Sequence, residues 1–458
     1  LHRKHYELQS YALDISVEPG VLQNRKVDTP AYSGNSGASG GPHLHFEIRE
    51  TSSQATLNPL KNGFTAKDFI RPVISLLKIY PSGNGSLVKG SPKPITLIPE
   101  GWGPVYRIPK RDTLEIAGSA WFGIQAHDLL NGETNKNGIF SMSLFIDSLE
   151  VFGIEFSKLF FDKARQIHTL CDYADFQETG RRIIQTRREA CNRLDIYSTL
   201  KDRGIYFFEQ NRIYHLKFVV HDHFGNISVL RFVVKGGKEV YAPYLRPSSA
   251  GILFRCNEGG SFDTTGFRFS APPEAFFDTV HFKYRQVVAP QAYFSAFHKV
   301  HSPSTALQKA CTLSLLPSRV PERLKNRILA VKIDKKGKPS PAGGQWEGEW
   351  FSTQIMSFGT YSLLADTLAP TIRPVNFRNH DNIARKDRIM LRIKDDLAGI
   401  RSYRPELNGE WILMEYDAKN HLLNWYPEER VRKGQNLLKI SVTDGVGNTS
   451  DAEFFLSF

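Results

Sequence analysis

The fold is decided by a stretch of alternating residues that ends in a turn, LKFVVHDHFGN at residues 216–226. Its apolar residues recur at every second position, as in a strand with one face in a core. The ending D-x-x-G-N predicts a hairpin, because the aspartate bonds its own turn backbone and the glycine supplies a positive φ. The pattern recurs as LKISVTDGVGN at residues 438–448, so the sequence predicts the same strand, turn and strand twice.

A second pair of segments repeats in the same order. WFGIQAHDLLNG at residues 121–132 and IMLRIKDDLAG at residues 389–399 both read as strands closed by an acidic turn with glycine. The two pairs together predict two copies of one immunoglobulin-like β-sandwich, at residues 68–237 and 366–458. The acidic turns could bind calcium, but neither has the ligand density of a calcium loop, so a structural turn is favoured.

The rest of the chain is also expected to be rich in strands. At 458 residues it has room for roughly three domains of about 150 residues. Residues 238–365 read as a strand-rich unit whose strands are shortened by frequent prolines. The first sandwich carries an insertion of aromatic and basic residues at 159–192. The predicted fold class is therefore all-β, with residues 1–66 as a separate unit before the array.

Composition narrows the classes of partner. The chain has a formal net charge of +12 and a pI of about 9.3. A basic surface suits anionic lipid headgroups, an anionic cell wall or nucleic acid. No nucleic-acid motif accompanies the charge, so we expect no nucleic-acid partner. No apolar run approaches the roughly 18 residues of a membrane helix, so no transmembrane segment is predicted.

The four cysteines leave two alternatives open. They stand at positions 171, 191, 256 and 311, without any C-x-x-C spacing of a zinc ribbon or redox site. An even number permits disulfides in an exported protein. Cys171 with Cys191 is the favoured pair, because both fall in one unit, and free buried thiols are the alternative.

The N-terminal region holds the one stretch that points to chemistry, SGNSGASGGPHLHFEIR at residues 33–49. A Gly/Ser loop runs into an alternating strand with His43 and His45 two residues apart. Alternate strand residues share a face, so the two histidines project together. This arrangement suits a metal ligand beside a group that serves substrate or water. The plain alternative is a pair of polar residues on an exposed strand face.

The segment GPHLHFE at residues 41–47 resembles the signature of lysostaphin/LytM-type zinc endopeptidases, which cut peptide cross-links in bacterial peptidoglycan. The resemblance implies that His45 is a zinc ligand and that His43 is the catalytic histidine. It also implies that an extended substrate peptide lies along the Gly/Ser loop, in a groove bordered by Ser33, Asn35, Ser36, Gly40 and Gly41. Val27 and Pro30 depart from the family pattern in the preceding strand.

The resemblance implies further zinc ligands that residues 1–458 do not supply. In that family they come from an upstream H-x-x-x-D motif. We therefore expect the chain to be the C-terminal part of a longer zinc metalloendopeptidase, with the fragment alone inactive, because His45 by itself cannot complete a three-ligand zinc site. His2 and His5 lie in a segment that reads as a short basic helix, and a solvated helix is favoured over ligands there.

The layout as a whole resembles envelope proteins of Bacteroidota that place a LytM-type domain before several β-domains. NKNGIFS at residues 135–141 carries this resemblance beyond the peptidase motif. It implies export to the periplasm or outer membrane, with peptidoglycan peptides or an outer-membrane protein assembly as partners. Two functions follow, a peptidoglycan-directed zinc metalloendopeptidase and a non-catalytic scaffold whose β-domains bind partners. A carbohydrate-binding module is weaker, because the tryptophans show no clustered spacing.

The same resemblance marks a recurring Asp-[Ser/Thr]-apolar motif as a candidate O-glycosylation sequence. The alternative is that the aspartate merely caps a turn. The strongest candidate is Thr367, which falls in an expected interdomain linker at 366–371. The four candidate positions are Thr113, Ser148, Thr279 and Thr367.

Overall fold

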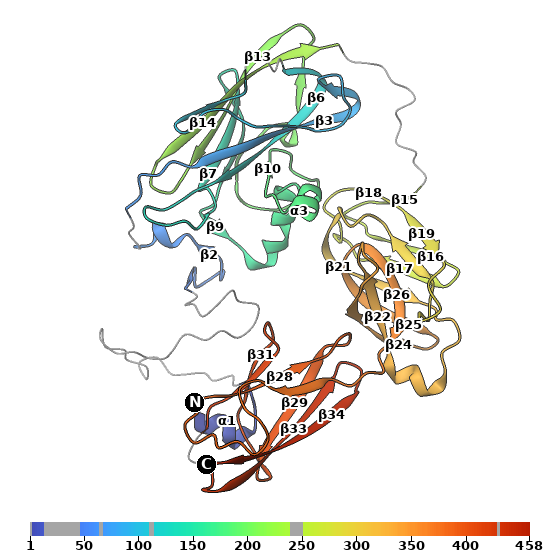
Figure 1. The fold of residues 1–458 in the computed structure, drawn as a ribbon. Coiled ribbons are helices and arrows are strands. Elements are labelled where there is room, and N and C mark those ends of the chain that lie inside the picture. The colour runs from blue at the N-terminus through green and yellow to red at the C-terminus, as the bar shows by residue number, and fades with distance from the viewer. Residues whose placement is uncertain (1, 13–45, 64–66, 110–113, 239–250, 428–430) are drawn as a thin grey trace.

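The polypeptide runs through three β-sandwich units in series, and the fold is all-β, as predicted (Figure 1). The computed structural model describes residues 2–12, 46–63, 67–109, 114–238, 251–427 and 431–458. Within these ranges helices are short, and none combines the length and apolar character needed to cross a membrane. Each unit has a main hydrophobic core, within residues 74–234, 254–363 and 377–456, and Cys191 packs into the middle one. A smaller cluster of Leu329, Val331 and Ile333 lies where the middle unit meets the last.

The first unit is built around one long twisted sheet with the order β11-β8-β7-β13-β14-β6-β3-β4. The strand β14 runs parallel to β6 and so joins the two halves of the sandwich. Three short strands pair off this path. The strands are β3 (Val73–Val88), β4 (Ile95–Leu97), β5 (Val105–Arg107), β6 (Leu114–His127), β7 (Ser141–Ile146), β8 (Leu149–Glu155), β10 (Ile184–Gln185), β11 (Tyr197–Leu200), β12 (Tyr206–Phe208), β13 (Ile213–His221) and β14 (Ile227–Gly237).

The expected insertion is the helical part of this unit. It begins with β9 (Lys158–Leu159) and a 3-10 helix at Phe161–Gln166, followed by α2 (Ile167–Leu170) and α3 (Tyr173–Thr179). Asp172 caps α3, because its side chain accepts a hydrogen bond from the backbone N–H of Asp175. In Figure 1 the insertion lies on the side of the first unit that faces the middle unit.

The middle unit is a sandwich of two five-stranded sheets, β16-β17-β21-β25-β24 and β19-β20-β26-β22-β23. Phenylalanine rings fill the space between the sheets, among them Phe267, Phe269 and Phe276. The strands are β15 (Ile252–Phe254), β16 (Gly260–Thr264), β17 (Phe267–Ala271), β18 (Val280–Phe282), β19 (Tyr284–Val287), β20 (Phe297–Val300), β21 (Ala306–Leu315), β22 (Ile328–Ile333), β23 (Pro339–Gly343), β24 (Gln345–Glu347), β25 (Trp350–Ser357) and β26 (Gly359–Ala365).

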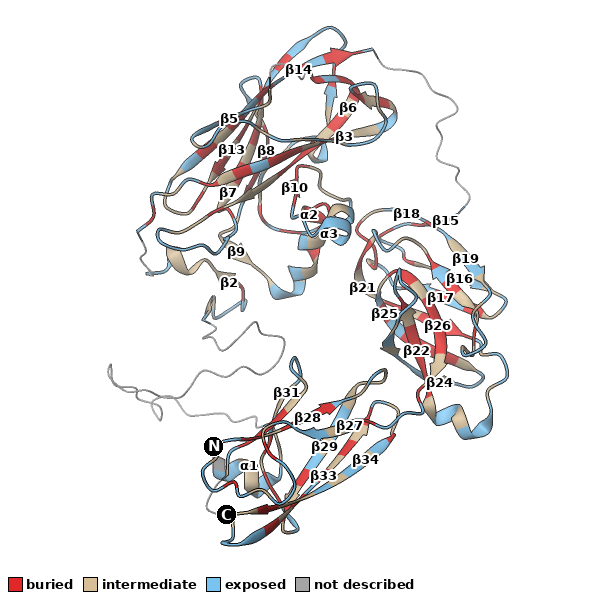
Figure 2. Ribbon diagram, in the orientation of Figure 1, coloured by how far each residue is buried: buried red, intermediate tan, exposed pale blue. Residues whose placement is uncertain are grey.

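The last unit has two four-stranded sheets, β27-β28-β32-β31 and β30-β29-β33-β34. Burial alternates along its strands, with every second residue of Gln435–Asp444 facing the core, and Figure 2 shows such buried residues in each unit. The strands are β27 (Thr371–Pro374), β28 (Ile389–Lys394), β29 (Ile400–Leu407), β30 (Glu410–Trp411), β31 (Glu415–Asp417), β32 (Leu422–Trp425), β33 (Gln435–Asp444) and β34 (Thr449–Ser457).

Strand pairing follows a similar pattern in the two units of the predicted repeat. In the first unit β3 pairs with β6, and β13 pairs with both β7 and β14. In the last unit β27 pairs with β28, and β33 pairs with both β29 and β34, in the same chain order. The predicted hairpin glycines have the positive φ that the turn requires, +88° at Gly225 and +89° at Gly447.

The favoured cysteine pairing is wrong. Cys191 bonds Cys256 of the middle unit, with a Cα–Cα distance of 6.2 Å, and Cys171 is a free thiol, as is the buried Cys311. The prediction paired the two cysteines that are close in the sequence. It was wrong because the insertion, which carries Cys191, packs against the middle unit. There the backbone N–H of Cys191 donates to the carbonyl oxygen of Phe277 at 2.8 Å.

The first described residues lie on the last unit. The helix α1 (His2–Leu8), expected from the sequence, places the ring of Tyr6 5.3 Å from that of Trp411, and Tyr11 follows at 5.2 Å. The indole N–H of Trp411 donates to the Tyr11 hydroxyl at 2.9 Å. The two ends of the chain therefore lie side by side (Figure 1).

Candidate functional site

The residues that the peptidase resemblance singles out lie outside the described residues. These are His43 and His45 and the groove residues Ser33, Asn35, Ser36, Gly40 and Gly41. The next described residue is Phe46, and the strand β1 (Ile48–Arg49) follows the motif directly. It pairs with β2 (Thr56–Leu57), which in turn pairs with β9 of the first unit.

Ion pairs reinforce this small three-stranded sheet. The Lys158 ammonium lies 2.6 Å from a Glu50 carboxylate oxygen, and Lys61 lies 2.8 Å from Glu155. The Arg49 guanidinium stands 4.5 Å from the ring centre of Phe161. The segment that contains the last residues of the peptidase-like motif is thus attached to the first sandwich.

Zinc ligands do not assemble in the described part of the chain. Within those ranges, the two groups that bring three potential ligands together consist of aspartates alone. His5 pairs its Nδ1 with the backbone carbonyl oxygen of Ser10 at 2.8 Å. A zinc ion of the LytM type needs imidazole nitrogen, so these residues do not fit it, and we derive no hydrolytic step through zinc.

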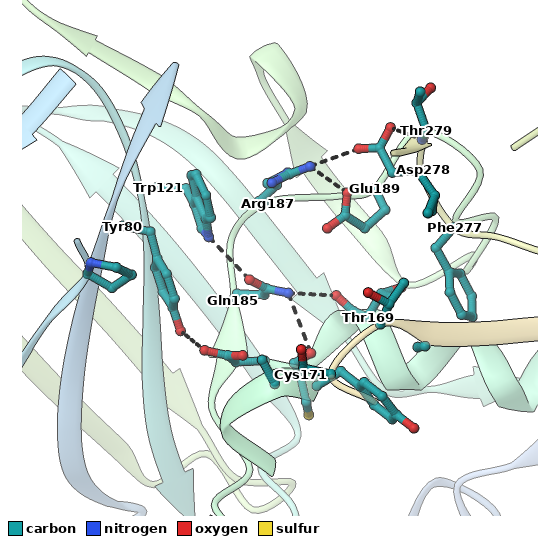
Figure 3. A pocket seen from close by; sticks show the side chains of 18 of the residues that line it. Tyr80, Trp121, Thr169, Cys171, Gln185, Arg187, Glu189, Phe277, Asp278 and Thr279 are labelled. Atoms are coloured by element: carbon teal, nitrogen blue, oxygen red, sulfur yellow. Dashed lines mark hydrogen bonds and ion pairs between the residues drawn. The ribbon is translucent and has the colours of Figure 1, made fainter. Parts of the chain in front are cut away.

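A cavity of about 640 Å³ lies where the insertion of the first unit meets the middle unit (Figure 3). Its walls come from β3 and β6, from the insertion, and from the segments 277–283 and 301–306 of the middle unit. Clefts between domains are common places for ligands, so this cavity is a candidate binding site.

One wall is a stack of aromatic rings backed by carboxylates. Tyr80 and Trp121 lie parallel, with ring centres 5.0 Å apart, and Lys78 bridges the carboxylates of Asp172 and Asp175 at 2.8 and 2.7 Å. The Tyr80 hydroxyl donates to Asp172 at 2.8 Å (Figure 3). Burial, together with these two carboxylates, raises the pKa of Tyr80 far above its usual value, so the hydroxyl stays protonated.

The other wall is an ion network that crosses between the two units. Arg187 donates to Glu189 at 2.7 Å and to Asp278 of the middle unit at 2.8 Å, as Figure 3 shows. Arg203 reaches the same Asp278 oxygen at 3.3 Å. Burial, and then the neighbouring Asp278, raise the pKa of Glu189 to about 7.

The chemistry available in this cavity is limited. Burial raises the pKa of the Cys171 thiol to about 11, which leaves it a poor nucleophile at neutral pH. The carboxylates are paired with Lys78, Tyr80 and Arg187, and their bonds join one segment of the wall to another. The ion pair between Arg187 and Asp278 therefore serves as a latch between the two units. The geometry of the cavity provides no activated nucleophile.

The candidate glycosylation residues lie in different surroundings. Ser148, Thr279 and Thr367 are exposed, while Thr113 lies outside the described residues. The aspartate before Thr279 accepts the backbone N–H of Thr279 itself at 2.8 Å, so the turn-capping alternative also has a geometric basis there. The modification stays a prediction at all four positions.

Sequence reasoning missed the latch. Arg187 and Asp278 lie 91 residues apart, and each has an ordinary local context in the sequence. The only local signal was the basic pair at 187–188 within the insertion, and such pairs are common on solvated surfaces.

Comparison with known proteins bears mainly on the middle unit. A model of the Zu5-like domain family matches residues 252–366. No curated protein matches the chain.

Several solved structures show weak likeness. Fibronectin(III)-like modules of Clostridium thermocellum CbhA are 11% identical, with 32% of this chain and 85% of that chain covered and a TM-score of 0.17. Sidekick-1 immunoglobulin domains 1–4 are 10% identical over 78% and 72%, with a TM-score of 0.15. Bacteroides ovatus SGBP-B, in complex with a mixed-linkage heptasaccharide, is 10% identical over 69% and 60%, with a TM-score of 0.14. Likenesses of this strength support no statement about function.

Proposed function

We propose that the chain is part of a peptidoglycan-directed, LytM metalloendopeptidase-like protein of the bacterial envelope. One observation carries the proposal. The seven-residue motif at 41–47 continues into β1, and β1 is joined through β2 to β9 of the first sandwich. In this proposal His45 holds zinc and His43 assists the reaction, as the resemblance implies. A zinc ion, when bound, would supply Lewis-acid chemistry for amide hydrolysis.

The β-units have a positioning role in this proposal. A two-residue strand contributes little by itself, but Lys158 of the sandwich pairs with Glu50, and Lys61 pairs with Glu155 of the sandwich, so both ion pairs help to hold the 46–62 segment on the sandwich. The sandwich is in turn latched to the middle unit through Arg187 and Asp278. A peptidase segment attached in this way would be held at a set place relative to whatever the array contacts.

The test uses the native protein and purified peptidoglycan sacculi. We expect wild-type protein to sediment with sacculi and to release soluble cross-link peptides in a zinc-dependent way. His45→Ala should lose both zinc and cleavage, while His43→Ala should keep zinc and lose cleavage. The control His215→Ala changes an exposed histidine of β13 and should have no effect. Unchanged cleavage by both His43 and His45 variants would refute the peptidase-like proposal.

A non-catalytic scaffold is the second candidate, and the junction between the first two units favours it. A disulfide, Cys191–Cys256, and the ion network around Arg187 tie the two sandwiches together, and no catalytic set appears in the described cavity wall. Wild-type protein that sediments with sacculi but releases no peptides, with or without added zinc, would support the scaffold. Absence of both binding and cleavage would overturn the peptidase-like proposal and a scaffold that acts on peptidoglycan.

A further inference from the structure

We propose that Asp68, Asp128 and Asp222 of the first unit bind a calcium ion. Each residue is at most 5% exposed, and one carboxylate oxygen from each lies within 4.8 Å of the others. Asp68 comes from the segment before β3, Asp128 follows the end of β6, and Asp222 opens the turn between β13 and β14. Three distant parts of the chain therefore bring acidic groups to one buried point.

Two of these carboxylates are incompletely bonded. Asp68 Oδ2 and Asp128 Oδ1 are buried, and neither has a hydrogen-bond partner among the described residues. No ion pair joins any of the three aspartates to a lysine or arginine of the described chain. Buried carboxylate oxygens without a donor or counter-charge are costly, and three of them repel one another. A cation placed among them removes both costs.

The remaining oxygens are held in position by the turn. Asp222 accepts the backbone N–H of Asn226 at 2.8 Å and its side-chain amide at 2.6 Å. The same amide donates to the backbone carbonyl oxygen of Asp68 at 3.2 Å, and the Ile70 N–H donates to Asp68 Oδ1 at 3.1 Å. Asp68 and Asp222 are thus fixed before any ion arrives, which limits the ordering needed on binding.

The donor set selects calcium among common cations. All three groups are carboxylates, which suit hard cations and not zinc or copper. Calcium accepts roughly six to eight oxygens in irregular geometry, including backbone carbonyls and water. Magnesium demands near-octahedral geometry and keeps several of its waters, which a site buried among three side chains accommodates poorly.

The last unit contains an equivalent cluster of aspartates whose oxygens are bonded differently. Asp366, Asp395 and Asp444 occupy the same positions in the last unit and also gather within 4.8 Å. There, however, Asp366 Oδ2 accepts the backbone N–H of Ala398 at 2.9 Å. One oxygen of Asp395 accepts two backbone N–H groups, from the segment 397–399, at 2.9 and 2.8 Å. Backbone donors in the last unit thus occupy oxygens that are free in the first, so we place the calcium site in the first unit alone.

The position of Asp68 gives the site a role that does not rest on the proposed function. Asp68 lies between the 46–62 segment and the first strand of the sandwich, β3. A calcium ion would clamp this entry segment to the two turns that carry Asp128 and Asp222. Calcium would therefore stabilise the attachment of the N-terminal segment, whether or not that segment is catalytic.

Calorimetric titration of the chelator-treated 1–458 chain with CaCl2 tests the proposal. We expect one calcium ion per chain, a higher Tm of the first unit in CaCl2, and at least tenfold weaker binding of MgCl2. Asp128→Asn should weaken calcium binding at least tenfold. Because this variant removes one of three repelling charges, it should still fold without calcium. The matched variant Asp395→Asn, in the last unit, should leave calcium binding unchanged.

Several results would overturn the proposal. These are the absence of binding heat with CaCl2, unchanged affinity in Asp128→Asn, or equal affinity for magnesium. A second calcium ion that disappears in Asp395→Asn would overturn the contrast between the two units. None of these outcomes depends on peptidoglycan, so the calcium site and the peptidase-like proposal can fail separately.

Discussion

The core of the middle unit contains a buried histidine that should make its stability depend on pH. His298 on β20 is 1% exposed, its Nδ1 lies 2.8 Å from the Tyr284 hydroxyl, and its ring stacks on that of Phe267 at 5.3 Å. Burial lowers the pKa of His298 from its ordinary 6.5 to about 4. Below pH 6.5 the unfolded chain therefore takes up a proton that the folded unit excludes.

The sign and size of the effect follow from linkage. The contribution of His298 is fully present above pH 6.5 and is lost as the pH falls from 6.5 toward 4. The pKa difference of about 2.5, at about 1.4 kcal/mol per pH unit, corresponds to about 3.5 kcal/mol in full, of which about 3 kcal/mol is lost by pH 4. The wild-type unit should thus lose about 3 kcal/mol more than a variant without this histidine over the same interval.

The variant His298→Phe keeps an aromatic ring in the stack and removes the titrating group. Hydrogen exchange of peptides from residues 280–315 measures the difference in unfolding free energy between wild type and variant at each pH. The intrinsic exchange rate is the same for both proteins at a given pH, so it cancels in the comparison. The exposed His281 on β18 provides the matched control, and His281→Phe should follow the wild type. Equal pH slopes for wild type and His298→Phe between pH 4 and 6.5 would refute the reasoning.

Three further predictions concern the disulfide, a hairpin glycine and a candidate glycosylation site. Cys256→Ser should destabilise the paired units by about 4 kcal/mol, because the disulfide closes a sequence separation of 65 residues, and an unchanged urea midpoint would contradict this. Gly225→Val should cost the first unit about 1 kcal/mol or more in thermal unfolding, because φ is +88° there, whereas Gly138→Val, which meets no neighbour and has no positive φ, should cost little. Peptide mapping of envelope-derived protein should find a glycan on Thr367, and an unmodified Thr367 in that material would remove this support for export.

Local chemistry explains why much of the fold could be predicted. The hairpins at 222–226 and 444–448 are specified by residues that lie within one turn, since Asp444 accepts the backbone N–H of Asn448 at 2.8 Å much as Asp222 does with Asn226. Alternation of apolar residues along the same strands specifies which face enters the core. These signals need no knowledge of distant segments.

The parts that escaped prediction depend on where distant segments meet. Cys256 is 65 residues from Cys191, and no spacing rule identifies the partner of a cysteine across a unit boundary. The acidic cluster was not predicted, because its third member, Asp68, lies outside the acidic turns that the sequence pattern identifies. A signal was present, since D-x-[I/L]-x-P occurs at both 68–72 and 366–370 and places an aspartate before the first strand of each repeat.

The Cys191–Cys256 bond also changes what a cut in the backbone can do. Together with the chain between them, the two cysteines close a covalent ring that includes β11 to β14 and the connection to the middle unit. A protease that hydrolyses one peptide bond within this ring opens it but separates nothing. The nicked protein would migrate as one species until the disulfide is reduced. Shedding of the first unit from the others therefore requires both a protease and a reductant.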